Sequence, residues 1–445
     1  MKPKHTYRTN IALLLIIAFS GSLYGYNIGV MAGVILFMKH APTITSAQIA
    51  LFTSAFLWGV ASAMLFVGYL ADKIGRKKTL ALSSIIAIAS IFAITFSHSI
   101  ATFTLARFTI GVACGMIIVA TPLYLTEIFP AHLRGRGTVA FQLSLSFGIL
   151  VSTILSYYFI DVTHWQLLFL YALIPSTLLL AAMLFVPESP RWLHMHNKLA
   201  AMKQALLFTH AVKEVDNISS QMLSHPPLHY FALLKLIMKD KRLMLILFIT
   251  IAIGILNQLT GINAILQYDS AILLMSGLHS HTSAIIGSIV MGGINFVTTI
   301  IAIFLIDKFE RKKLLRMGII GIIVCLSLLA AANLLLEPGH IKGMVTLALL
   351  VAYVISFAIA PGATIWTLMS EILPSSIRSI GLSIALFLGS IAAALLTLVF
   401  LPLVKNVGLS SILLICIISS VIYLITTYFI PNTSGKTLEE IESSL

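Results

Sequence analysis

Amide and aromatic side chains inside long apolar runs are the residues of this sequence that could do chemistry. Because amides both donate and accept hydrogen bonds and a ring offers an apolar face, this set suits a neutral ligand rich in hydroxyl groups. The alternative at each position is a side chain that only bonds a neighbouring helix. In chain order, the residues are Gln142, Asn257, Gln258, Asn263, Asn295 and Trp366.

No arrangement for covalent or metal chemistry accompanies these amides. The sequence holds no phosphate-binding loop, nucleotide fingerprint or Ser/His/Asp set, so we expect neither an enzyme nor a cofactor. His194 with His196, and His279 with His281, have no cysteine or carboxylate at ligand spacing. We therefore interpret these pairs as loop histidines and expect no metal site.

Arg107 is a charged residue within an apolar run. An arginine at the middle of a membrane-spanning helix costs about 2.5 to 3.5 kcal/mol on insertion scales, so Arg107 requires a polar partner. Gly111 and Gly115 continue the same helix face. Their small size would let another backbone pack closely beside the arginine.

Charged turns occur twice, about half the chain length apart. Residues 68–78 contain Asp72 and Arg76, and residues 307–313 contain Asp307 and Arg311. An acid and an arginine seven positions apart then follow in each half, as Glu127 with Arg134 and as Glu371 with Arg378. We expect the acids to meet the arginines of the turns and to form two ion-pair networks. These networks would latch one conformation, or alternatively only fix the topology.

The elements that position these residues are twelve predicted membrane-spanning helices. The composition is 59% hydrophobic and 10% charged, with a mean hydropathy of +1.03, which excludes a single soluble domain. Six runs long enough to cross a bilayer lie in each half. The predicted spans are 11–33, 47–70, 79–97, 100–123, 138–160, 165–186, 243–275, 282–306, 315–336, 343–369, 379–403 and 409–430.

The distribution of the 28 basic residues predicts the orientation of these spans. If both termini are cytoplasmic, only Lys39, Lys342 and Lys405 lie in loops on the opposite side, as the positive-inside rule requires. The net charge of +13 then reflects topology, and we expect no nucleic-acid partner. The chain is predicted to be a multi-pass protein of a plasma membrane or a bacterial inner membrane.

Four segments are expected along the chain. Residues 187–242 form the long polar stretch, and helical spacing of apolar residues within 197–222 predicts short amphipathic helices at the membrane surface. The predicted divisions are 1–190 as an N-terminal six-helix bundle, 191–242 as a cytoplasmic linker, 243–430 as a C-terminal six-helix bundle and 431–445 as a cytoplasmic tail.

The charged turns, Pro187-Glu-Ser-Pro-Arg-Trp-Leu193 and Pro431-Asn-Thr-Ser-Gly-Lys436 together resemble the sugar porter family of the major facilitator superfamily. The resemblance covers essentially the whole chain. It implies an all-α fold of two pseudo-symmetric six-helix bundles with a central sugar site that opens alternately to each side. By this resemblance the substrate-contacting positions are Gln142, Gln258, Ile262, Asn263, Asn295 and Trp366. Gly261 is expected to break its helix and to release backbone groups toward the site.

The resemblance also assigns a partner to Arg107, at position 27. Proton-coupled members of the family carry an aspartate there, and facilitative hexose carriers carry an asparagine. The present motif contains Asn27. Since an amide has no proton to release, the sequence favours uncoupled or weakly coupled transport. A sugar/proton symporter that uses another acid, such as Asp269 or Glu127, is the alternative.

Departures from the family pattern affect the choice of substrate. Ile149 stands where a second glutamine is common, Gln267 replaces one of two tyrosines, and Glu310 replaces a glycine of the second charged turn. Span 11 has Gly389-Ser390 where members often have a polar and an aromatic contact. We therefore expect a monosaccharide or polyol of unspecified identity, carried by a monomer. A non-transporting sugar sensor is a further alternative, although the tail is short for one.

Overall fold

The computed structural model describes residues 4–38, 44–97, 99–129, 131–159, 165–209, 215, 240–278, 280–306, 308–374 and 377–430. At residues 4–12, 131–139, 366, 370 and 379 only the backbone is described. All the regular structure in these ranges is helical, and twelve helical segments are long and apolar enough to cross a membrane. The predicted all-α membrane fold with twelve spans is therefore confirmed.

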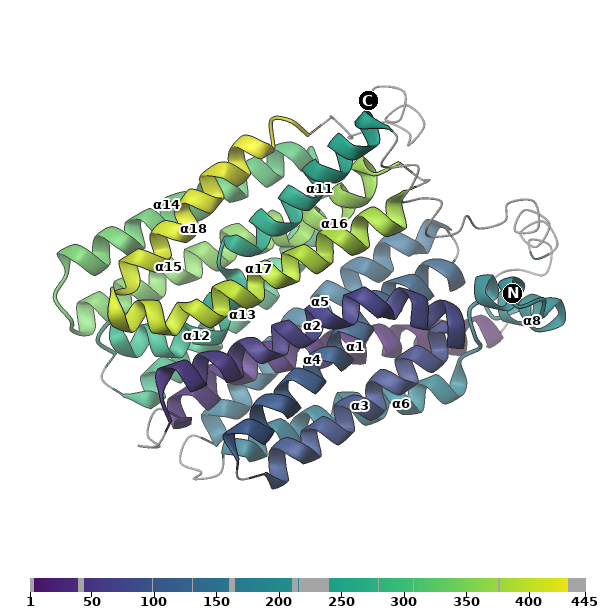
Figure 1. The fold of residues 1–445 in the computed structure, drawn as a ribbon, viewed down its shortest axis with the longest axis horizontal. Helices are drawn as coiled ribbons and strands as arrows, with labels where there is room; N and C mark the ends of the chain where they lie inside the picture. Colours follow the sequence, from purple (N-terminus) through teal and green to yellow (C-terminus); the bar gives the residue numbers. More distant parts are fainter. Residues whose placement is uncertain are drawn as a thin grey trace.

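The first half of the chain forms one bundle of six spans (Figure 1). The sixth span begins as a 3-10 helix, η1, and continues as α6. In this bundle α1 packs against α5, α2 against α4, and α3 against both α4 and α6. The bounds are α1 Lys4–Met38, α2 Ser46–Ile74, α3 Arg76–Phe96, α4 Ile100–Ile128, α5 Ala131–Tyr158, η1 Trp165–Ala172 and α6 Leu173–Phe185.

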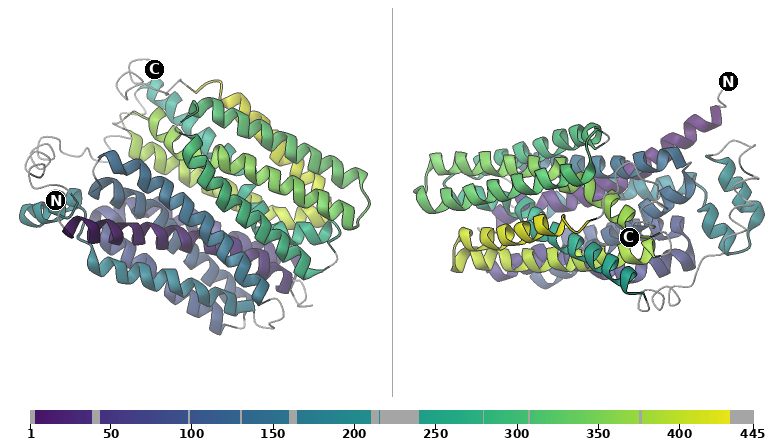
Figure 2. Two further views of the ribbon diagram at one scale, coloured as in Figure 1. Left: turned by 180° about the vertical axis from the view of Figure 1, so that it is seen from behind. Right: turned by 90° about the horizontal axis from the view of Figure 1, so that it is seen from above.

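The second half repeats this arrangement with two interrupted spans. The two bundles lie side by side, and α2 contacts α17, α5 contacts α13, and α1 contacts α12 across the seam between them (Figure 2). The bounds are α11 Lys241–Leu259, α12 Ile262–Met275, α13 His281–Leu305, α14 Arg311–Leu335, α15 His340–Ile359, α16 Pro361–Ile372, α17 Arg378–Asn406 and α18 Leu409–Thr426.

Both interruptions lie near the middle of a span. Gly261 adopts a left-handed conformation with φ of 96°, which separates α11 from α12 as the sequence predicts. Ala360 has φ of −119° and ψ of −81° and separates α15 from α16. The second break was not predicted. Pro361 explains it, because proline has no N–H to donate and restricts the residue before it.

Several helices extend beyond the apolar windows of the sequence. For example, α3 begins at Arg76 rather than at residue 79, and α14 begins at Arg311 rather than at residue 315. Hydropathy detects only the part of a helix that can lie in hydrocarbon. Long basic side chains at a helix end can instead reach the membrane surface, so the helix continues past that window.

Two short helices of the linker pack on the end of the first bundle. These are α7 Pro190–Met195 and α8 Leu199–Leu207, and together they form a small apolar cluster that buries Trp192, Met202 and Leu206. The rest of the predicted amphipathic segment lies outside the described residues, apart from Val215. We call this end of the molecule, seen at the right of Figure 1, the linker end, and the opposite one the far end.

Among the described residues, the apolar cores of the two bundles meet at the far end. One cluster joins the first bundle to the far half of the second and contains residues such as Ile17, Leu273 and Phe400. The linker half of the second bundle has a separate cluster, which includes Ile253 and Met369. The seam is therefore packed shut at the far end, and the bundles are distinct bodies at the linker end.

Candidate functional site

A cavity of about 1040 Å³, including its open mouth, lies on the seam between the two bundles. Both bundles line it, through α1, α2, α4 and α5 on one side and α11, α12, α13, α15, α16 and α17 on the other. The interruptions at Gly261 and Ala360 lie beside it, since Ile262, Ala358 and Gly362 belong to its wall.

Five of the six predicted contact residues line this cavity, namely Gln142, Gln258, Ile262, Asn263 and Asn295. They come from helices of both bundles, so only the assembled seam brings them together. The backbone at Trp366 belongs to α16, but its side chain lies outside the described residues. Substrate contact by all six remains a prediction.

The amides of the second bundle are arranged with spare hydrogen-bonding capacity. The Asn263 side-chain amide donates to Gln258 Oε1 over 2.6 Å, which fixes the two side chains against each other. Asn257 also lines the cavity, and its Oδ1 atom is buried without a hydrogen-bond partner. A buried carbonyl oxygen left unpaired is unfavourable by about 1 to 3 kcal/mol, so a ligand hydroxyl or water would satisfy it.

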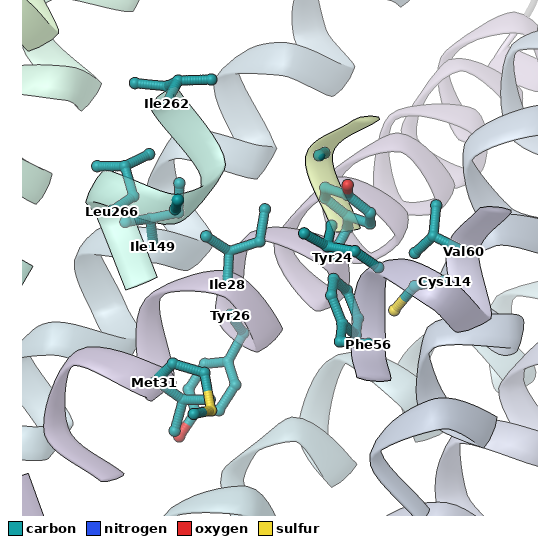
Figure 3. Close-up of a cluster of buried hydrophobic side chains, with 14 of the residues drawn as sticks. Tyr24, Tyr26, Ile28, Met31, Phe56, Val60, Cys114, Ile149, Ile262 and Leu266 are labelled. Carbon is teal, nitrogen blue, oxygen red and sulfur yellow. The ribbon is translucent and has the colours of Figure 1, made fainter. Parts of the chain in front are cut away.

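Apolar side chains form the far wall of the cavity. Ile28 and Ile149 of the first bundle face Ile262 and Leu266 of the second, as Figure 3 shows. Ile149 is 2% exposed and lines the cavity, so this wall is apolar where the resemblance expects a glutamine. These four side chains separate the cavity from the far end.

The residues that α17 contributes to the cavity wall have small and weakly polar side chains. Gly389 and Ser390 both line the cavity, and Ser390 Oγ lies 3.4 Å from Met64 Sδ of α2. Tyr24 and Phe357 supply rings from opposite bundles. Ile149 and Gly389-Ser390, where the sequence departs from the family pattern, thus all line this cavity.

Arg107 is completely buried beside the cavity, in contact with Asn27. Its guanidinium donates to Asn27 Oδ1 over 3.1 Å and to the Asn27 carbonyl over 2.5 Å. The rings of Phe56 and Phe169 lie 4.7 Å and 5.5 Å from its central carbon. Neutral oxygens and aromatic faces thus stabilise the Arg107 cation. No carboxylate is among its described contacts.

The first charged turn forms an ion-pair cluster at the linker end, in which Arg76 and Glu127 are buried and Asp72 is exposed. Arg76 makes ion pairs of 2.9 Å with both Glu127 and Asp72. Ser189, which precedes α7, donates its hydroxyl to Glu127 Oε2 over 2.5 Å. The indole of Trp192 donates to the Asp72 carbonyl over 2.8 Å. The side chain of Arg134 lies outside the described residues.

The second charged turn forms a more exposed counterpart. Arg311 pairs with Glu371, and Arg378 Nε donates to the Leu373 carbonyl over 3.2 Å. Asp307 lies outside the described residues. Each of the two arginine–glutamate pairs joins helices of a single bundle, so separating the bundles does not by itself require that either pair break. The predicted latching function stays a prediction.

Sequence reasoning missed two features of the site. Asn257 was named among the intramembrane amides but was not predicted to contact the substrate. Ser189 and the break at Ala360 had no periodic or charge signal, although the neighbouring Pro361 pointed to the break. Within the described residues, no group of three histidine, cysteine, aspartate or glutamate side chains could hold a metal ion.

Comparison with known families matches residues 13–445 to the family model of sugar (and other) transporters. The glucose transporter GlcP of Staphylococcus epidermidis is 32% identical over 98% of each chain. The galactose-proton symporter of Escherichia coli K12 is 28% identical, over 98% of this chain and 96% of its own.

A solved structure has the same fold. It is a partially occluded, inward-open conformation of the xylose transporter XylE from Escherichia coli, which aligns with a TM-score of 0.81. The alignment covers 96% of this chain and 99% of that one at 24% sequence identity. The arrangement of two six-helix bundles is thus shared over the whole length of both proteins.

Proposed function

The chain belongs to the sugar transporter family, within the major facilitator superfamily, and on that premise we propose that it carries a neutral monosaccharide, or a polyol of similar size, by alternating access. The cavity on the seam is the observation that carries this proposal. Amides from both bundles line it, and none of the described lining residues is charged. A charged substrate would lack a counter-ion there, whereas hydroxyl groups would find donors and acceptors.

We further propose that the structure represents a state open to the cytoplasm. The bundles share a core at the far end and have separate cores at the linker end, which supports access from the linker end. The excess of lysine and arginine in the loops at the linker end supports a cytoplasmic location for it. Closing the linker end and parting the far end would then expose the same amides to the outside.

We propose that sugar transport is not coupled to proton movement, because position 27 is an asparagine. Arg107 is held there by an amide and a backbone carbonyl, and an amide does not exchange protons at physiological pH. A proton crossing a potential of 100 mV carries about 2.3 kcal/mol. Without that contribution, the carrier equilibrates its substrate instead of concentrating it. The Escherichia coli relative is a galactose-proton symporter. Proton coupling through an acid other than position 27 is therefore the competing hypothesis.

Uptake into liposomes tests substrate and coupling together. Labelled glucose, galactose, xylose and a polyol would be offered to the purified protein, first as counterflow and then with an imposed inward proton gradient. Counterflow of at least one compound without accumulation is the expected result. Accumulation above equilibrium would reject uncoupled transport, and no counterflow of any compound would favour the sensor.

The predicted contact residues can be tested with matched variants. Gln258→Ala should lower the transport rate at least tenfold, because it removes both a ligand contact and the partner of Asn263. The control is Asn333→Ala, an amide of the same bundle that bonds Ser410 and does not line the central cavity. Uptake by Gln258→Ala equal to that of the control would contradict the proposed site.

A further inference from the structure

Asp269 is a buried carboxylate at the far end that the proposed transport cycle does not use. It lies in α12 and is 2% exposed. Oδ1 accepts a 2.8 Å hydrogen bond from the Ser288 hydroxyl of α13 and a 2.5 Å bond from the Ser270 backbone N–H. Both donors are neutral. A carboxylate removed from water with neutral donors only is much less stable in its ionised form than a hydrated one.

The residue next to Asp269 makes a contact that joins the two bundles. Ser270 Oγ donates to the Ala32 carbonyl of α1 over 2.5 Å, and α12 packs against α1 along this stretch. Asp269 itself bonds only groups of the second bundle, but it lies one residue from this contact, on the helix that loses α1 as a neighbour when the far end opens. Separation would let water reach the carboxylate.

Among the residues that the structure describes, the helices around Asp269 provide no counter-ion. The hydroxyl groups of Tyr26 and Tyr268 donate to backbone carbonyls, and the ammonium of Lys342 donates to the Asn333 carbonyl. Within the described residues, Asp269 forms no ion pair. The titratable side chains at the far end of α1, α12, α13, α15 and α17 are Tyr26, Tyr268, His281, His340, Lys342 and Lys405.

We infer that Asp269 is a proton-binding site of the far-end gate: it takes up a proton from the far side when the bundles close over it and returns it there when they part. Asp269 does not line the central cavity, so its proton has no described route to the linker end. Proton binding then favours the closed gate without carrying a proton across the membrane. This inference rests on the proposed alternating-access function.

The direction and size of the pH effect on the gate follow from the linkage between proton binding at Asp269 and gate closure. The closed state binds one more proton than the open state wherever the carboxyl is neutral in the first and ionised in the second. The ratio of closed to open protein then falls as the pH rises, by at most about tenfold per pH unit for one proton. Low pH at the far side should therefore favour the state described here.

The gate can be observed directly with two spin labels. Ala47 of α2 and Asn406 of α17 are both exposed at the far end on neighbouring helices, and the three native cysteines are buried. Labels on Ala47→Cys and Asn406→Cys in lipid nanodiscs would report the closed fraction as a short interspin distance. We expect this fraction to fall as the pH rises from 5 to 8.

Two variants separate a proton site from a merely structural residue. Asp269→Asn mimics the protonated form, so its closed fraction should equal the low-pH value of the parent at every pH. Ser270→Ala keeps the acid and removes the contact with Ala32, so it should lower the closed fraction but preserve the pH dependence. An unchanged pH dependence in Asp269→Asn would overturn the inference.

Transport measurements distinguish this inference from the proposed function. Parent and Asp269→Asn proteins would be compared in liposomes, with the external pH varied during counterflow and with an imposed proton gradient. Loss of the response to external pH in Asp269→Asn, without accumulation by either protein, supports both proposals. Accumulation that depends on Asp269 would overturn uncoupled transport together with the claim that the proton returns to the far side. Sugar transport with equal pH responses would overturn the gate alone.

Discussion

The linker ends of the two halves carry the same ion pair in different surroundings. The side chains of Arg76 and Glu127 are 3% and 5% exposed, whereas those of Arg311 and Glu371 are 31% and 22% exposed. Water reaches part of the second pair, in which Glu371 Oε2 is nonetheless buried, while the first pair is almost completely shielded from water. Two matching motifs in one chain can therefore differ widely in their contribution to stability.

The difference comes from the segment that covers the first pair. Residues before and within α7 pack over it: Glu188 accepts hydrogen bonds from the backbone of Lys77 and Ser189, and Ser189 bonds Glu127. In the second half, Lys312 contacts the Ile430 carbonyl and Arg316 bonds Thr427, so the end of α18 is tied to the start of α14. These contacts lie beside the Arg311–Glu371 pair and leave it partly exposed.

The most direct way to break this comparison is to remove one acid from each pair. Glu127→Ala should destabilise the protein by about 3 kcal/mol, the lower end for breaking a buried ion pair, because Arg76 loses its buried carboxylate but keeps the exposed Asp72 as a counter-ion. Glu371→Ala should have an effect of about 0 to 1 kcal/mol, since water can replace the lost contact. Thermal unfolding in one detergent would rank the variants, and equal losses of stability would reject the distinction.

A smaller effect is expected from the covering segment itself. Ser189→Ala removes a hydrogen bond to a buried carboxylate and the cap of α7, with an expected loss of about 1.5 to 3 kcal/mol. The control is Thr177→Ala, whose exposed hydroxyl bonds only its own helix. The part of this loss that comes from the hydrogen bond to Glu127 should disappear in a Glu127→Ala background, whereas the part that comes from the cap of α7 should remain.

Helix packing offers a third comparison of the halves, with the smallest expected effect. A methyl group added at Gly25 of α1 would overlap the Leu145 carbonyl of α5, whereas one at Gly254 of α11 would lie 2.9 Å from the Ala385 carbonyl of α17. Gly25→Ala should therefore lower stability by about 1 to 3 kcal/mol. Gly254→Ala should lose less, because the gain in helix propensity offsets a milder clash. The reverse order in thermal unfolding would contradict this reading of the packing.

Much of the fold could be read from the sequence because its causes are local. Apolar length identified the spans, and the freedom of glycine at positive φ identified the break at Gly261. Repetition of the charged turns indicated two equivalent halves. The break at Ala360 leaves no mark in the hydropathy of the chain, because the sequence around Pro361 is apolar on both sides.

The candidate site was predicted less completely because its contacts connect residues distant in sequence. Residue types and family resemblance selected amides that the structure places on one cavity. They could not reveal that Asn257 keeps an unpaired oxygen, that Ser189 reaches Glu127, or that Ser270 beside Asp269 bonds α1 of the opposite bundle. Each of these depends on the packing of helices 60 or more residues apart or on the burial of a single atom.

The sequence by itself determined that this protein is a membrane-embedded carrier with two similar halves, since hydropathy and motif order belong to the chain and do not depend on how it packs. Only the tertiary structure decided which ion pair is buried, which amide lacks a partner and where the seam is closed. The physical reason is that burial and hydrogen-bond satisfaction are properties of neighbouring groups. Identical residue types therefore acquire different energies when different helices cover them.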